Sequence, residues 1–421
     1  MSTFISQFSG LPTSAQLRSL VGDLPALNQL PFSRLSPDSY ERKYLTTVYD
    51  IITRGRAKSS RPGQNTLMLD DVQFSVDISN DKIPLLNSRF VPTKAFIVET
   101  LWFLSGSTNV RFLKENGVSI WDDWVEPGTE VFAPAEKYTA QEVLNYLRLK
   151  EPKIYTAWNK YKSAEVTGRP TLMEIEKFFN VHYQGKRAVQ ELPCVKLVDG
   201  SIGTGAYGAQ WRKWKDLRAV VGTVAQKLVG RGTHAHIGTA RFNGSAGTSD
   251  LVGAEIDQIA DVIKALKTSP DSRRIIVTAW NPPQIPDAIL PPCHSFFQFI
   301  STVNEETNER ELTVKLTQRS ADFLIGSVFN IAQYAMLAHM IAQLTDHKAT
   351  KLVYSPTDCH IYEDQLPLVR EQLMREVKDS NGTLWFHNCP TKIEHFTVNT
   401  VRIDGYRSED VHPNIPYPVA V

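Results

Sequence analysis

The amino-acid sequence predicts an α+β fold. Two segments are strongly apolar and long enough for buried helices, residues 94–104 and 330–344. Three others have the apolar content or the alternation of strands, residues 274–280, 295–302 and 312–317. Because the strands occur in clusters and do not alternate regularly with helices, we expect an α+β arrangement instead of a parallel α/β sheet.

The first predicted helix begins near Tyr40, since residues such as Val48 and Ile51 recur on one helical face. A basic turn with a glycine over residues 54–63 and a strand over residues 66–76 follow. These elements begin the main domain.

Two later elements have equally clear patterns. A helix is expected after Glu255, where one face carries Ile256, Ile259, Val262, Ile263 and Leu266. The strand at 312–317 alternates apolar with polar side chains, so it is expected to bury one face only.

The chain is expected to divide into an extension and one catalytic domain that carries two insertions. Residues 1–37 have weak periodicity and form the N-terminal extension, which packs loosely or binds a ligand of its own, and residues 38–421 form the domain. The insertion at about 126–203 is polar and lysine-rich, and we expect it to be mostly helical. The insertion at about 213–253 is rich in glycine, threonine and histidine without a period, which indicates a mobile loop.

Composition excludes several classes of protein. The 421 residues carry a formal net charge of +1, with 42% hydrophobic and 22% charged residues, so no global field favours DNA or an anionic membrane. No apolar run reaches the roughly 18 residues of a membrane span, and the first residues lack the pattern of a secretory signal. The cysteines are widely spaced, which predicts free thiols, no metal site and a cytoplasmic protein; they are Cys194, Cys293, Cys359 and Cys389.

Cys293 has the most informative surroundings. It follows Pro291 and Pro292, precedes His294 and opens a predicted strand. A thiol near cationic groups has a lowered pKa and becomes a better nucleophile. A small buried apolar side chain is the other interpretation of a free cysteine, and the residues alone leave both open.

Several arginines are candidates for binding an anion. Arg273 and Arg274 enter a predicted strand side by side, so one of them should be buried or lie in an interface, unless the pair forms a solvated turn. Arg319 ends the strand that includes Gln318, where its guanidinium could bind a phosphate through two hydrogen bonds. Arg61, in a glycine-containing turn, is a weaker candidate.

Three polar residues could recognise a nucleoside. Asn330 offers a donor and an acceptor, which match the N3–H and O4 of uracil, although a helix N-cap is the simpler interpretation. His360 and Tyr362 alternate along a short predicted strand and face one side, where they could bind a sugar hydroxyl or pack at a surface.

The combination resembles the folate-dependent thymidylate synthase family from Tyr40 to the C-terminus, apart from the two insertions. Ordered motifs carry the resemblance: Leu290-Pro-Pro-Cys-His294, Gln318-Arg-Ser-Ala-Asp322, Phe329-Asn-Ile-Ala332 and Asp358-Cys-His-Ile-Tyr362. Further matches begin at Glu99, Ile120 and Ala206, and the chain ends in Pro418-Val-Ala-Val421. The resemblance implies a large mixed β-sheet packed with helices and dimerisation through a face of that sheet.

The resemblance also implies a reaction. Cys293 would add to C6 of dUMP, 5,10-methylenetetrahydrofolate would supply both the methylene carbon and the hydride, and dTMP would result without a metal. Asn330 would bind the uracil edge, while Glu99 and Tyr207 would serve proton transfer. The implied catalytic residues are Cys293, Glu99, Tyr207, Arg319, Asp322 and His294.

The implied ligand contacts extend over the whole domain. The phosphate would be bound by Arg61 and Arg319 of one subunit of a homodimer and by Arg273 and Arg274 of the other, and Ser320 would support them. The other implied dUMP contacts are Gln318, Asp322, Asn330, His360 and Tyr362. The implied folate contacts are Ile120, Trp121, Trp124, Leu290, Asp322, Gly326, Phe329 and Val421.

The chain departs from the family pattern at several places. It has Ser327-Val328 in place of a Leu-Pro pair before Phe329, Phe90 in place of a basic residue, and Glu363-Asp364-Gln365 after Tyr362. These departures suggest a divergent branch, with a virus-encoded protein as one alternative. They leave two other functions open: a dUMP hydroxymethylase, which adds water instead of hydride, and a non-catalytic nucleotide-, folate- or RNA-binding module.

Overall fold

The computed structural model confirms a mixed α+β architecture built on a large sheet. It describes residues 11–60, 63–125, 130–134, 143–145, 147–148, 152–165, 174–175, 177–178, 194–198, 200–241, 248–379 and 381–419. These residues belong to two compact units. The first comprises residues 1–107, 205–286 and 291–421, and the second comprises 108–204 and 287–290.

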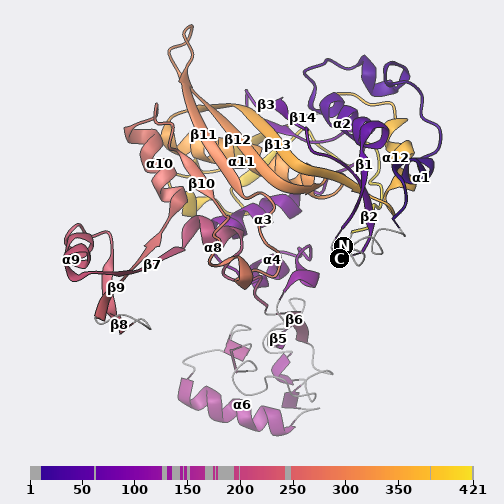
Figure 1. Ribbon diagram of the computed structural model, residues 1–421. Helices are drawn as coiled ribbons and strands as arrows, with labels where there is room; N and C mark the ends of the chain where they lie inside the picture. The colour runs from indigo at the N-terminus through magenta and orange to yellow at the C-terminus, as the bar shows by residue number, and fades with distance from the viewer. Residues whose placement is uncertain are drawn as a thin grey trace, which may run out of the picture. The chain divides into compact units, whose positions relative to one another are not determined.

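The first unit contains a seven-stranded mixed sheet (Figure 1). Only β12 and β13 run parallel, and the other neighbours are antiparallel. Along the sheet the strands are β1 (Arg56–Ser59), β2 (Asn65–Leu69), β13 (Lys348–Tyr362), β12 (Arg310–Asp322), β11 (Phe296–Val303) and β10 (Ile276–Thr278), and β3 (Phe74–Asp77) also pairs with β13. The segment expected as one strand over 66–76 is therefore two strands.

One face of this sheet packs against α11 (Gly326–Thr345). Leu312, Val314 and Leu316 of β12 are fully buried, whereas the residues between them are half-buried, as the alternation predicts. The helix is buried on nearly every side, because α3 (Thr93–Leu104) and α10 (Gln258–Thr268) also pack against it. The sheet and α11 thus form the core that positions the candidate site.

The helix α11 begins four residues earlier than expected. Ile325 is its N-cap residue and makes no side-chain cap. Asn330 therefore lies inside the helix, and the N-cap interpretation of this residue is wrong. Its amide is free to serve another purpose.

The expectation of a mobile loop over 213–253 is also wrong for the part that the structure describes. β7 (Trp214–Val220), β9 (Thr248–Ile256) and β8 (Ala235–Arg241) form a three-stranded antiparallel sheet, with α9 (Gly222–Gly230) packed against it. Most side chains of β7 are exposed on both faces, so its sequence has no apolar period. This module connects α8 (Tyr207–Arg212) to α10.

From residue 11 onward the N-terminal segment is mostly exposed, but a few of its side chains are buried against the catalytic domain. Leu17 of α1 (Ser14–Ser19) is buried, and Phe32 is fully buried. The guanidinium of Arg18 donates hydrogen bonds to carbonyl groups at the end of α2 (Tyr40–Arg54). These contacts attach the extension to the catalytic domain.

The remaining elements complete both units. The first unit has α12 (Leu366–Leu373) and a small sheet of β15 (Val401–Asp404), β14 (Asn381–Phe386) and β4 (Lys82–Pro84). The described residues of the second unit include strands as well as helices, namely α4 (Arg111–Glu115), β5 (Glu130–Pro134), α6 (Pro152–Glu165) and β6 (Cys194–Val198). Among the helices that the structure describes, none combines the length and hydropathy needed to cross a membrane.

Candidate active site

The loop that carries Cys293 is fixed on both sides. The backbone N–H of Cys293 donates to the Tyr207 hydroxyl over 2.9 Å, and the backbone carbonyl of Cys293 accepts from the backbone N–H of Arg319 over 2.8 Å. The Arg319 guanidinium donates to the carbonyls of Pro292 and Pro291 over 3.0 and 2.7 Å. Cys293 itself is half-buried, so the thiol sits in a defined loop and remains partly accessible.

His294 does not provide the positive charge that the sequence suggested for the thiol. It is buried beneath Tyr207, with ring centroids 4.1 Å apart, and its Nδ1 lies 2.8 Å from the Tyr334 hydroxyl. Desolvation by burial lowers the pKa of His294 to about 3, so the ring is neutral at pH 7. Arg319 is a cation that contacts this loop directly, through the carbonyls of Pro291 and Pro292.

Tyr207 retains its proton. It is the first residue of α8 and stacks on Phe103 of α3, with ring centroids 4.9 Å apart. Burial raises the pKa of Tyr207 well above its usual value, so its hydroxyl accepts the bond from Cys293 as a neutral group. A neutral phenol at this position can both accept and donate a hydrogen bond.

A chain of hydrogen bonds joins Asn330 to Glu99. Gln318 Nε2 donates to Asn330 Oδ1 over 3.0 Å, and Asn330 Nδ2 donates to Gln333 Oε1 over 3.0 Å. Gln333 Nε2 then donates to the Glu99 carboxylate over 2.5 Å. The Tyr354 hydroxyl donates to Gln318 Oε1 over 3.0 Å. This bond fixes which end of the Gln318 amide donates, and so the donor-to-acceptor direction of all the hydrogen bonds that follow. Two predicted site residues are thereby coupled through Gln333, which the sequence did not single out.

Asp322 lies at the end of β12 with both carboxylate oxygens engaged. Oδ1 accepts from the backbone of Ile325 and Oδ2 from Gln365, each over 3.1 Å. Burial raises the pKa of Asp322, and bonds from these donors only partly offset that effect. Gln365 is fully buried and also binds the backbone of Tyr362 and of Pro418, so it joins three parts of the site. No sequence pattern indicated this residue.

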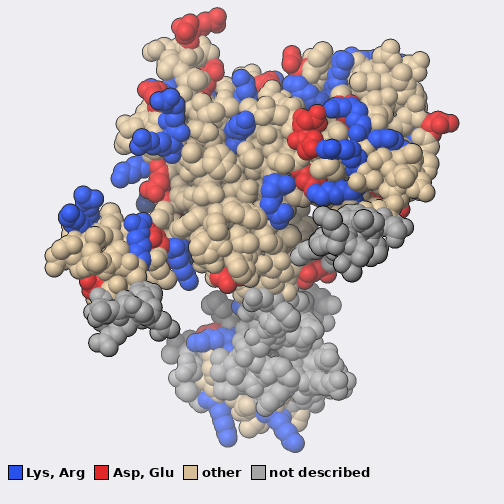
Figure 2. All heavy atoms as spheres, in the orientation of Figure 1, with Lys and Arg blue, Asp and Glu red and all other residues tan. Residues whose placement is uncertain are grey.

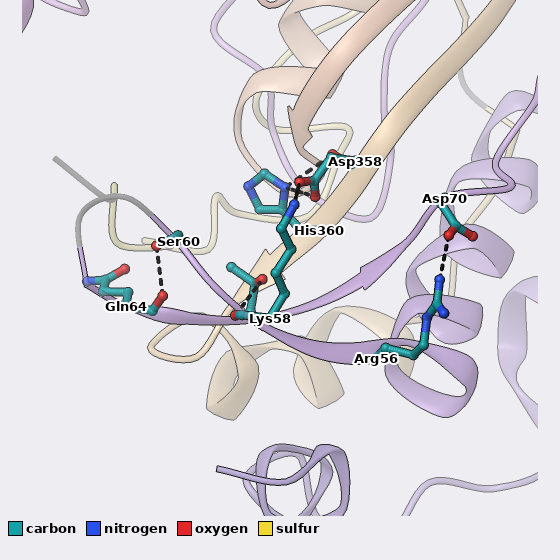
Figure 3. Close-up of polar contacts among 8 residues, drawn as sticks. Arg56, Lys58, Ser60, Gln64, Asp70, Asp358 and His360 are labelled. Carbon is teal, nitrogen blue, oxygen red and sulfur yellow. Dashed lines mark hydrogen bonds and ion pairs between the residues drawn. The ribbon is translucent and has the colours of Figure 1, made fainter. Parts of the chain in front are cut away.

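His360 and Tyr362 lie together near the end of β13, with ring centroids 4.9 Å apart. His360 Nδ1 is 3.1 Å from Asp358 Oδ1, and Asp358 in turn pairs with Lys58 of β1 (Figure 3). Ser320, on β12, lies opposite Asp358. The structure thus places these residues on neighbouring strands at one end of the sheet.

The arginine pair is exposed in the single chain, which leaves both an interface and a solvated turn as interpretations. Arg273 and Arg274 form a turn, and both are exposed, because β10 begins only at Ile276. Strand alternation therefore does not apply to them. Within the described residues neither forms an ion pair. Arg61 lies outside the described residues.

The implied folate residues fall in both units. Asp322, Gly326 and Phe329 belong to the first unit, and Gly326 and Phe329 are half-buried at the start of α11. The second unit contributes Ile120, which is exposed, Trp121, which is buried, and Trp124 and Leu290, which are half-buried. Val421 lies outside the described residues. The structure describes no group of three or more His, Cys, Asp or Glu side chains that could hold a metal ion.

Comparisons with known proteins identify the family. The family model described as thymidylate synthase matches residues 42–421. Thymidylate synthase from Listeria monocytogenes serotype 4b (strain CLIP80459) is 31% identical over 382 residues, which cover 90% of this chain and 100% of the relative. The protein of the same name from Listeria innocua serovar 6a (strain ATCC BAA-680 / CLIP 11262) is also 31% identical over 382 residues, with the same coverage of both chains. The chain therefore belongs to the thymidylate synthase family, whose members are enzymes that transfer one-carbon units.

Proposed function

We propose that this protein is a thymidylate synthase that converts dUMP to dTMP, with Cys293 as the nucleophile that adds to C6 of the pyrimidine. The fixed loop around Cys293 carries the proposal. Because Tyr207 and Arg319 hold the backbone on either side of the thiol, the sulfur can stay within bonding distance of one ring atom. A structural cysteine would not require a partly accessible thiol beside a neutral phenol.

The amide of Asn330 would recognise the base. Its oxygen accepts from Gln318 and its nitrogen donates to Gln333, and an amide keeps a second acceptor position on the oxygen and a second donor on the nitrogen for a ligand. These groups match the N3–H and O4 of uracil. Glu99, at the far end of the hydrogen-bond chain, would organise proton transfer at the base, and the neutral Tyr207 hydroxyl would assist proton removal at C5 through a hydrogen bond.

The phosphate would be bound in a homodimer. Arg61 and Arg319 would bind it from one subunit, supported by Ser320, and the partner subunit's Arg273 and Arg274 would complete the site. Two exposed arginines without an ion pair in the described residues support this arrangement, since an anion would give them a partner.

The free face of the large sheet would form the dimer interface. Ile276 and Ile300 of this face are 37% and 39% exposed, and Trp280 next to β10 is 39% exposed. Figure 2 shows that few charged side chains lie over β11 and β12 on the face that it displays. A large, mostly uncharged patch of this kind is typical of a surface that a partner covers.

The family uses 5,10-methylenetetrahydrofolate, which would supply the carbon and the hydride when bound. In the first unit the half-buried Phe329 offers a ring surface, and the half-buried Asp322 offers a carboxyl group to a polar ring system. Both features fit a flat heterocycle with hydrogen-bonding edges. Gly326, in the same unit, would provide a further part of this surface.

A product assay tests the proposal. The protein is incubated with dUMP and 5,10-methylenetetrahydrofolate, and the products are separated by chromatography. We expect dTMP and dihydrofolate; hydroxymethyl-dUMP with tetrahydrofolate would instead identify a hydroxymethylase. Cys293→Ser should reduce turnover by at least about 1000-fold while dUMP still binds. Cys389→Ser, at an exposed free thiol, is the matched control and should retain full activity.

A covalent trap tests the nucleophile directly. With 5-fluoro-dUMP and the folate, mass spectrometry should find an adduct on the peptide that contains Cys293. Turnover without such an adduct would refute the role of Cys293, and no turnover with any pyrimidine nucleotide would refute the enzyme assignment.

A further inference from the structure

A cavity of about 680 Å³ lies in the first unit at the C-terminal end of α11. Its walls come from the turn before β4, the hairpin between β11 and β12, the start of β13, and β14. The candidate active site uses the start of α11 and the ends of β12 and β13, so this cavity has no part in it. Its volume is within the range of roughly 300–1,000 Å³ that small-molecule sites have.

Carboxylates outnumber cations in this cavity. Asp81, Glu309 and Glu311 line it, whereas Lys348 is the only lysine or arginine among its described lining residues. Lys348 Nζ is 3.9 Å from Glu309, and both side chains are more than half exposed, so this pair neutralises little of the charge. Glu311 accepts a hydrogen bond from Asn304 over 2.7 Å, and this neutral donor leaves the charge of Glu311 in place. The cavity therefore favours a cationic ligand.

His339 of α11 is a buried residue of the cavity wall with one ring nitrogen that makes no hydrogen bond. The side chain is 6% exposed. Its Nε2 lies 3.1 Å from the backbone carbonyl of Lys82, which can only accept, so Nε2 carries a proton. Within the part of the chain that the structure describes, Nδ1 has no hydrogen-bond partner, and the Asp81 carboxylate 3.8 Å away is too distant to be one.

The ring of His339 is neutral near pH 7. Desolvation by burial lowers the pKa of His339, and the Lys82 carbonyl and the charge of Asp81 only partly oppose this effect. Nδ1 therefore presents a lone pair, and two acceptors lie 3.8 Å apart with no proton between them. The nitrogen of an ammonium group can lie about 2.9 Å from both atoms and donate to each of them.

The turn that carries Asp81 has a defined backbone. Asn80 and Asp81 have positive φ angles of 55° and 59°, which Asn and Asp adopt more readily than other residues with a side chain. The backbone N–H of Lys82 donates to the Ser79 carbonyl over 3.3 Å, and the Asp81 carbonyl accepts from the backbone N–H of Leu384 over 2.8 Å. These bonds attach the turn to β14 and keep the Asp81 side chain beside the cavity.

Trp385 of β14 adds an aromatic surface to the same cavity. It is 41% exposed, and its indole N–H donates to Asp404 over 2.7 Å, which fixes the orientation of the ring. An exposed indole face attracts organic cations and packs against methylene groups. A metal ion fits less well, because the described residues include no group of three or more His, Cys, Asp or Glu side chains that could hold one.

We propose that this cavity binds a small aliphatic polyamine. One ammonium group donates to His339 Nδ1 and to the Asp81 carboxylate, and the methylene chain lies against Trp385. A second ammonium group meets the carboxylates of Glu309 and Glu311. Because the carboxylates come from two separate elements, the turn before β4 and the β11–β12 hairpin, the cavity suits two separated charges better than one. The site is independent of the proposed binding of dUMP.

Calorimetry tests the proposal with spermidine as the probe, in about 0.15 M salt and without a nucleotide. We expect saturable binding of one spermidine per chain. Asp81→Asn should weaken binding at least about tenfold, because an ammonium group loses a charged acceptor, while asparagine still tolerates the positive φ. Trp385→Leu and Glu311→Gln should each weaken it at least about threefold. The monoamine n-butylamine should bind at least about tenfold more weakly than spermidine.

Glu305→Gln is the matched control. It removes one negative charge from an exposed position of the same hairpin, at a residue outside the cavity. This variant should bind spermidine within about twofold of the unmodified protein. An equal loss of affinity in Glu305→Gln and Asp81→Asn would indicate only a general attraction of cations and would overturn the proposal, as would the absence of saturable binding.

Nitrogen-15 NMR of labelled histidine tests the position of the ligand. The His339 signals are assigned by their loss in His339→Gln. We expect Nδ1 of His339 to be unprotonated without a ligand and to shift when spermidine is added, while the signals of His360, at the opposite end of β13, stay unchanged. Spermidine that binds without shifting His339 would refute the proposed position. Since no nucleotide is present, these outcomes are separate from the conversion of dUMP, which the product assay tests.

Discussion

Gln333 of α11 donates a hydrogen bond to the Glu99 carboxylate of α3 over 2.5 Å. Both side chains are buried, and the oxygen of the same Gln333 amide accepts from Asn330. An amide whose two ends are both used cannot rotate without breaking two bonds. Asn330, which would recognise the base, and Glu99, which would organise proton transfer, are therefore both bonded to the amide of Gln333.

Replacing Gln333 should impair both ends of this connection. Gln333→Leu leaves Glu99 and the Asn330 amide without their partner, so we expect kcat with dUMP to fall roughly 10- to 100-fold. The free energy of unfolding should fall by about 1–3 kcal/mol. Initial rates and urea denaturation measure the two effects. Gln343→Leu, at an exposed position of the same helix, is the control: it removes one hydrogen bond to the Pro390 carbonyl, so it should leave kcat unchanged and lower the free energy of unfolding by no more than about 1 kcal/mol.

His294 should make the protein sensitive to acid. Burial lowers its pKa to about 3, compared with about 6.5 in an unfolded chain. The unfolded state therefore binds the proton first, and stability is lost as the pH falls from about 6.5 to about 3, by on the order of 4 kcal/mol in total. The measurement is the free energy of unfolding across this range for the unmodified protein and for His294→Gln.

The difference between the two curves of unfolding free energy against pH gives the contribution of His294 alone. Burial raises the pKa of Asp322, and it raises that of Glu41 to about 7, so protonation of these groups stabilises the folded state as the pH falls. Both contributions are common to the two proteins and cancel. Curves that run parallel from pH 6.5 to 3 would contradict the prediction.

The core could be predicted from the sequence because its elements bury a regular face. In β12, Leu312, Val314 and Leu316 alternate with polar residues, since only one face of the strand meets α11. The module over residues 213–256 gave no such signal. Leu217 of β7 is 68% exposed, and Ile237 of β8 is 55% exposed, so burial imposes no period on these strands.

The candidate site could be predicted only in part. Cys293 and Asn330 occur in recognisable motifs, but the partner that orients Asn330 is found only in three dimensions. Gln333 and Glu99 are 234 positions apart, and the sole hint was that Gln333 follows Asn330 by three residues, which places both on one helical face. The sequence showed Gln365 only as part of a departure from the family pattern and gave no hint of its role, because its partners lie at the ends of two strands and in the C-terminal segment.

Mixing two inactive variants should restore activity if the phosphate site is shared between subunits. In one variant Arg273 and Arg274 are replaced by alanine, and in the other Cys293 is replaced by serine. A mixed dimer has one site with an intact Cys293 from one chain and intact arginines from the partner. Random re-association should then recover about a quarter of the normal activity. No recovery, when sedimentation shows that mixed dimers form, would place both arginines outside the site.

Changing Asn330 to aspartate should move the preference from dUMP toward dCMP, because a carboxylate accepts from the amino group of cytosine. The contacts of Asn330 limit what this substitution can achieve. The new carboxylate would face the Gln333 oxygen, and two acceptors repel each other, so the Gln333 amide must rotate. After that rotation the Gln333 nitrogen no longer donates to Glu99. We therefore expect Asn330→Asp alone to gain dCMP binding but little dCMP turnover, with dUMP turnover reduced at least about 10-fold. Steady-state rates with both nucleotides measure this, and unchanged selectivity for dUMP would show that Asn330 does not contact the base.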